Sequence, residues 1–169
     1  MFVETALIQR LILPLEHPAF AVAAVLAALL VSSGAGSLLS QRFPMLQHPA
    51  TAAGIALLVT LYSLVLPAVT ASLSPLALPA KTGAVFLFLT PLGLLLGIPF
   101  PSGLRALGAT EPLLIPWAWV INGCCSVLAP ILAIMLATLA GFSTVLALGA
   151  AAYGLACINL YWFQWGGLD

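Results

Sequence analysis

The sequence contains very few charged residues. Only 5% of its 169 residues are Asp, Glu, Lys or Arg, and none of these lies between Glu111 and Asp169. Soluble domains carry about a quarter charged residues, whereas 63% of this chain is hydrophobic. At about 1.5 Å per residue, a helix as long as the uncharged tract would far exceed the roughly 30 Å hydrocarbon layer. The tract must therefore cross a bilayer and return, which indicates a polytopic membrane protein.

Residues suited to metal binding or catalysis are also scarce. The chain has two histidines, His17 and His48, and three cysteines, Cys124, Cys125 and Cys157. The two imidazoles are predicted at opposite membrane faces, and the cysteines lack the spacing of a zinc site or a redox pair. The predicted spans place no His, Lys or carboxylate beside a Ser or Cys nucleophile. We therefore predict no metal, no cofactor and no enzymatic activity.

Polar and proline-containing segments divide the apolar sequence into five predicted spans. We place them at residues 17–40, 49–72, 81–98, 116–139 and 143–164, each long enough to cross the hydrocarbon layer as a helix. The sequence thus predicts an all-α fold, a polytopic bundle of about five transmembrane helices in one membrane domain, residues 17–169. Arg10 and Lys81 fall on one membrane face, and Arg42 and Arg105 on the other. Because each face carries two basic residues, the excess of Lys and Arg that marks the cytoplasmic face does not give the orientation.

Residues 1–16 form a separate short segment in this division. The segment is apolar but too short to span, and Glu4, Gln9 and Arg10 interrupt it. Two arrangements fit: a short amphipathic helix lying along the interface, or the last part of a span whose beginning is missing from this chain.

Small residues at helical spacing predict close contacts between spans. They are Gly34 and Gly36 in the first span, Gly93 and Gly97 in the third, and Gly154 in the fifth. Small side chains let helix backbones approach closely in lipid. The sequence does not decide whether these faces meet one another or another protein.

Five polar or proline residues are the best candidates for a functional site. Pro99 and Pro101 cannot both lie in a regular helix interior, so we place them, with the nearby Arg105, at a membrane interface. Asn122 and Asn159 are the deepest amides of the predicted spans. In hydrocarbon, each is expected to hydrogen-bond to a neighbouring helix.

An ordered series of motifs resembles a known family. The motifs are Phe2–Arg10, His17-Pro18, Ser33–Ser40 with Arg42, Pro99–Arg105 and Leu114–Leu128. The series resembles the C-terminal membrane portion of bacterial spermidine-synthase-like integral membrane proteins, over nearly the whole chain. The resemblance implies a multi-pass protein of the bacterial inner membrane. The soluble domain of that family would bring a Gly-rich cofactor turn, which this chain lacks, so no synthase activity is carried over.

The sequence offers no set of residues suited to catalysis, and its small residues at helical spacing indicate helix packing. Together these features favour a structural role. We expect a non-catalytic membrane module that anchors or stabilises a larger assembly, with membrane lipids and other membrane subunits as partners. The zero net charge gives no attraction to nucleic acid, so no such partner is predicted. The alternative is a transport or small-molecule-binding module lined by the Pro-Phe-Pro segment, Arg105 and Asn122.

Overall fold

The computed structural model describes residues 1–43 and 50–165, and within these ranges the chain is helical without strands. The elements are α1 (Phe2–Leu11), α2 (Pro18–Arg42), α3 (Ala50–Leu73), α4 (Leu78–Leu96), α5 (Pro99–Thr110), the short 3-10 helix η2 (Pro112–Leu114), α6 (Ile115–Ala140) and α7 (Phe142–Trp165). Five segments of the described chain are long and apolar enough to cross a membrane. The predicted all-α helical bundle is confirmed.

The described helices end close to the polar and proline-containing segments that were used to predict the limits of the spans. The third predicted span begins earlier than expected, because Pro79 fits into the first turn of α4, where its missing N–H is not needed. A break at Gly97-Ile98 separates α4 from α5, and together they form a continuous apolar stretch, Leu78–Thr110. Residue 49, the predicted start of the second span, lies outside the described residues.

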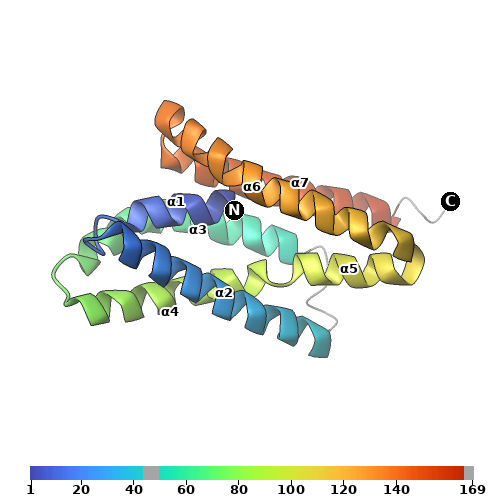
Figure 1. Ribbon diagram of the computed structural model, residues 1–169, viewed down its shortest axis with the longest axis horizontal. Helices are drawn as coiled ribbons and strands as arrows, with labels where there is room; N and C mark the ends of the chain where they lie inside the picture. Colours follow the sequence, from blue (N-terminus) through green and yellow to red (C-terminus); the bar gives the residue numbers. More distant parts are fainter. Residues whose placement is uncertain (44–49, 166–169) are drawn as a thin grey trace.

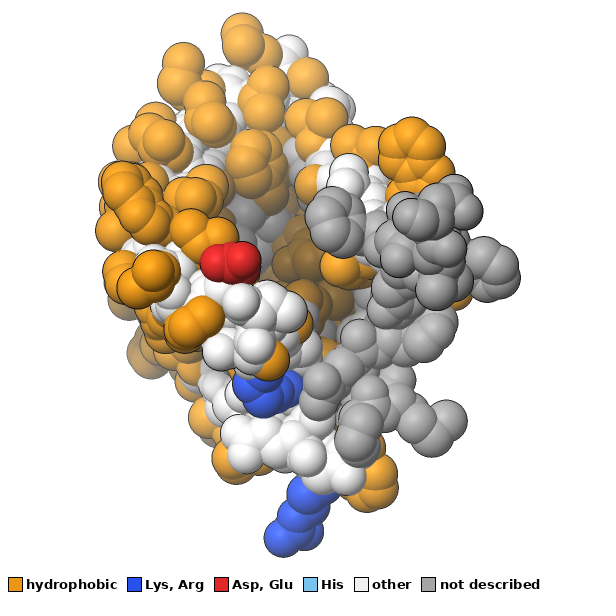
Figure 2. All heavy atoms as spheres, turned by 90° about the vertical axis from the view of Figure 1, so that its right-hand side faces the viewer, with side chains coloured by type: hydrophobic (Ala, Val, Ile, Leu, Met, Phe, Trp, Pro, Cys, Tyr) orange, Lys and Arg blue, Asp and Glu red, His pale blue; other side chains and the backbone are white. Residues whose placement is uncertain are grey.

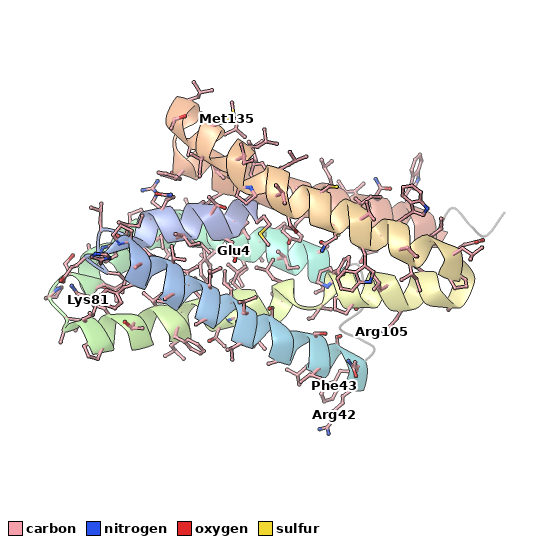
Figure 3. The ribbon with its side chains drawn as sticks, in the orientation of Figure 1. Glu4, Arg42, Phe43, Lys81, Arg105 and Met135 are labelled. Atoms are coloured by element: carbon pink, nitrogen blue, oxygen red, sulfur yellow. The ribbon has the colours of Figure 1, made fainter. Side chains whose placement is uncertain are left out.

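The long helices lie roughly along one axis of the molecule (Figure 1). The most extensive contacts join α2 to α4 and α3 to α7, and α6 packs against α7. Lys81 marks one end of the bundle, while Arg42 and Arg105 lie toward the other (Figure 3). Helix α6 begins, and α7 ends, at the Arg105 end (Figure 1). The exposed side chains of Trp117 and Trp162 therefore lie toward the same end.

Glycine allows the close contact between α2 and α4. A Cβ atom built on Gly36 would lie 2.8 Å from the carbonyl carbon of Leu94, and one on Gly97 would lie 2.6 Å from the carbonyl carbon of Ser33. A Cβ on Gly93 would overlap the hydroxyl of Ser32. These three predicted glycines face the partner helix at positions where no larger residue fits without movement of the backbone or of Ser32.

Helix α1 lies within the bundle instead of along its outer surface. Val3, Ala6, Leu7 and Leu11 are buried, and the helix contacts α7, α6 and α2. Gly149 of α7 permits this approach, because a Cβ there would lie 2.8 Å from Cγ2 of Val3. With 10 residues, α1 extends only about 15 Å, and Figure 1 places its N-terminal end near the middle of the long axis. It therefore fills the centre of the bundle over only part of its length.

Candidate functional site

A cavity of about 660 Å³ opens beyond the N-terminal end of α1. Helices α2, α6 and α7 form most of its walls, and the first turn of α1 closes it on one side. From the right-hand end of Figure 1, the surface is hollowed between groups of hydrophobic side chains (Figure 2). A volume of this size is typical of small-molecule sites in proteins.

Five polar side chains from four helices line this mainly apolar space. They are Glu4 of α1, Ser33 of α2, Asn122 and Ser126 of α6, and Tyr153 of α7. The remaining lining includes Leu29, Leu96 and Leu148. We call this space the α1 cavity. Few polar groups within apolar walls fix the orientation of a ligand while the walls supply contact area.

Glu4 brings a carboxylate to the interior of the bundle. Its side chain is 17% exposed, and Figure 3 shows the residue between the Lys81 end and the Arg105 end. The N-terminal ammonium of Met1 lies 3.9 Å from Oε2 of Glu4. Sequence reasoning missed this residue because the segment before residue 17 is too short to span. The available signal was the helical spacing of the apolar residues around Glu4, which marks a buried face.

Asn122 lies at the α1 cavity, with its side chain free of hydrogen bonds in the described structure. Its backbone carbonyl accepts a hydrogen bond from the Ser126 hydroxyl at 2.7 Å. Asn159 is exposed on α7 and its amide also makes no hydrogen bond to the described residues. The predicted interhelical bonds of both amides are therefore not formed, because one faces the cavity and the other faces outward. The Asn122 amide remains available to a ligand.

Arg105 and the two prolines occupy a different place. Nη2 of Arg105 donates hydrogen bonds to the hydroxyls of Ser40, at 3.0 Å, and Ser102, at 3.1 Å. The guanidinium therefore ties α5 to the end of α2. Pro99 and Pro101 lie in the first turn of α5, where a missing N–H costs no helical hydrogen bond. These three residues do not line the α1 cavity, so Asn122 is the only part of the predicted polar lining that does.

The predicted packing glycines divide into two groups. Gly36, Gly93 and Gly97 lie in the α2–α4 contact, whereas Gly34 and Gly154 have open space where a Cβ would lie. The same helix α2 therefore carries one glycine that faces α4 and another, two residues away, that faces outward.

The ends of the bundle hold two polar contacts that sequence reasoning also missed. Nζ of Lys81 is paired with Oε1 of Glu16, and the Lys81 side chain is 3% exposed while that of Glu16 is 69% exposed. Nη2 of Arg10 donates to the hydroxyl of Ser143 at 2.8 Å, which joins α1 to the first turn of α7.

The described histidine, His17, makes a local contact with the backbone. Nδ1 of His17 accepts a hydrogen bond from the backbone N–H of Ala19 at 3.4 Å, so His17 caps the start of α2. His48 lies outside the described residues. No group of three His, Cys, Asp or Glu residues suited to a metal is found among residues 1–43 and 50–165.

Comparison of the chain with protein-family models, curated proteins and solved structures finds no match. The similarity to spermidine-synthase-like membrane proteins therefore stays a prediction from the sequence motifs.

Proposed function

We propose that this protein is a non-catalytic membrane module that binds a small, largely apolar molecule in the α1 cavity. The observation that carries the proposal is the combination in this cavity of Glu4 and Asn122 with apolar walls. Ionisable and polar side chains inside a membrane bundle are costly and commonly mark substrate or ion pathways. One carboxylate, one amide and hydroxyls suit recognition and orientation of a ligand.

A fluorescence experiment with a neutral apolar probe tests this function. The full chain in nanodiscs of zwitterionic lipid is titrated with 1-aminoanthracene, and empty nanodiscs correct for partition of the probe into lipid. We expect saturable binding to the protein. Ala152 lines the cavity, so Ala152→Leu should weaken binding about tenfold, equivalent to about 1.4 kcal/mol.

The neighbouring residue supplies the matched control. Ala151 is exposed on α7 and does not line the cavity, so Ala151→Leu should bind the probe like the unchanged protein. Binding that does not exceed that of empty nanodiscs would contradict the proposal. Equal losses in both leucine variants would contradict it as well.

A second candidate function, anchoring of a larger membrane assembly, is supported by the exposure of α6. Only Ala133 and Ala137 of this helix are buried among the described residues. Gly123 on α6, like Gly34 and Gly154, has open space beyond its Cα. Outward small residues permit close approach of another helix.

Copurification in a mild detergent tests the anchoring role. A membrane partner should accompany the unchanged chain and be lost from Gly123→Leu, whose own fold should be unaffected because the position faces open space. Recovery of a stable, lone monomer from gentle extraction would argue against anchoring.

We also propose that the protein resides in the bacterial inner membrane. The support is the motif resemblance together with the five apolar helices. Fractionation of expressing bacterial cells should recover the chain with inner-membrane markers after alkaline washing, and recovery in the outer membrane would oppose this location.

A further inference from the structure

One acidic side chain lines the α1 cavity. Glu4 is the only Asp, Glu, Lys, Arg or His side chain that lines it within the described structure. Two described guanidinium groups are engaged elsewhere: Arg10 bonds Ser143, and Arg105 bonds Ser40 and Ser102. A ligand in this cavity therefore meets a carboxylate whose one charged neighbour, among the described residues, is the N-terminal nitrogen of Met1.

The one ionic contact of Glu4 among the described residues is not a hydrogen bond. The N-terminal nitrogen of Met1, which also lines the cavity, lies 3.9 Å from Glu4 Oε2. At this separation the two charges attract without a tight hydrogen bond. The carboxylate oxygens of Glu4 therefore keep acceptor positions that an ammonium N–H can use.

The rest of the cavity suits a hydrocarbon body. Leu29 and Leu30 of α2, Leu96 at the end of α4, and Leu148 of α7 contribute apolar walls around the polar groups. Contact with such walls stabilises an apolar molecule by roughly 25 cal/mol per Å² of surface removed from water. Asn122, whose side chain makes no hydrogen bond here, adds an amide oxygen that can accept from an N–H group.

We propose that the ligand of the α1 cavity is a lipophilic amine in its ammonium form, with its nitrogen on the carboxylate of Glu4 and its hydrocarbon part along the leucine walls. The inference rests on the proposed binding function and adds the chemical class of the ligand. A carboxylate bonded to an ammonium forms a charge-assisted hydrogen bond, stronger than one to a neutral group. A ligand with a carboxylate or phosphate would instead be repelled by Glu4.

Displacement of bound 1-aminoanthracene by three eight-carbon molecules tests whether the cavity prefers a lipophilic amine. Octylamine, octanol and octanoate share a chain and differ in charge at its end. In the full protein in zwitterionic nanodiscs, with free concentrations corrected by empty nanodiscs, octylamine should displace the probe at about tenfold lower concentration than octanol. Octanoate should be the weakest of the three.

Substitution of the carboxylate separates charge recognition from the cavity itself. In Glu4→Gln, octylamine and octanol should displace 1-aminoanthracene at equal concentrations, and a circular dichroism spectrum like that of the unchanged protein shows that the bundle is intact. Glu111 is exposed and does not line the cavity, so Glu111→Gln is the matched control and should keep the preference for octylamine.

The outcomes distinguish this inference from the function on which it rests. If the probe binds and Ala152→Leu blocks it, but octanol and octylamine compete equally in the unchanged protein, the ammonium class is refuted and the binding function stands. A preference for octylamine that persists in Glu4→Gln also refutes the inference. If neither the probe nor octylamine binds above empty nanodiscs, both proposals are refuted.

Discussion

Replacement of Gly36 by alanine is expected to destabilise the bundle by separating α2 from α4. The new Cβ would lie 2.8 Å from the carbonyl carbon and 3.0 Å from the Cα atom of Leu94, whereas ordinary contact begins at 3.4 Å. Both opposing atoms belong to the backbone, so no side-chain rotation relieves the overlap. The helices must move apart, and the contacts on either side of Gly36 lengthen with them.

The magnitude follows from two opposing effects. Overpacking of a close contact costs about 1–3 kcal/mol, and alanine is favoured over glycine in a helix by up to about 1 kcal/mol. With central values of about 2 kcal/mol for the overpacking and about 1 kcal/mol for the helix propensity, we expect Gly36→Ala to lower the free energy of unfolding by about 1 kcal/mol. Gly97→Ala acts on the same contact, so the double variant should lose less than the sum of the two single losses.

The assay is SDS-induced unfolding in dodecyl maltoside micelles, followed by circular dichroism. Gly34→Ala is the matched control, because it lies on the same helix with nothing within 4 Å of its Cβ position. Gly34→Ala should leave stability unchanged or raise it slightly through helix propensity. Equal stability of Gly36→Ala and the unchanged protein would refute the reasoning, and so would a comparable loss in Gly34→Ala.

Three further substitutions have defined outcomes. Glu16→Gln removes the negative charge that pairs with the buried Lys81 ammonium and should cost about 1–2 kcal/mol in the same SDS titration. The double variant with Lys81→Met should recover most of this loss, and a double variant less stable than Glu16→Gln alone would oppose the reasoning. Tyr62→Phe removes the hydrogen bond that the Tyr62 hydroxyl of α3 donates to the backbone carbonyl of Phe88 in α4. The free energy of unfolding should fall by about 0.5–1.5 kcal/mol and no more, because the packing of the two rings remains. An unchanged titration midpoint would show that this bond contributes nothing. Asn122→Leu should weaken 1-aminoanthracene binding several-fold more than Arg105→Ala, since only Asn122 lines the cavity, and equal effects would count against this assignment.

The candidate site was only partly accessible from the sequence. Asn122 was predicted as a polar residue inside a span, and it lines the cavity. Glu4 was assigned to a short segment outside the spans, because residues 1–16 are too few to cross a bilayer. Its place in the site depends on α1 packing between other helices, which segment length does not reveal. Arg105 was predicted to share the site with Asn122, but it bonds Ser40 instead.

The glycines illustrate the same limit at the level of packing. Their spacing predicted close helix contacts, and Gly36, Gly93 and Gly97 do lie between α2 and α4. Spacing alone could not separate them from Gly34, which faces open space two residues away. Both faces of these helices are apolar, so no polar face marks the outward direction as it would in a soluble helix.

The sequence by itself determined that this chain is an all-α bundle with five helices able to cross a membrane. The reason is physical: a hydrocarbon layer requires each span separately to be long, apolar and internally hydrogen-bonded, and these properties are local. Only the tertiary structure decided that α1 enters the bundle, that Glu4 reaches the cavity and that Lys81 is buried against Glu16. These features depend on which helix lies beside which, and that choice is made by shape and by a few polar contacts between segments distant in sequence.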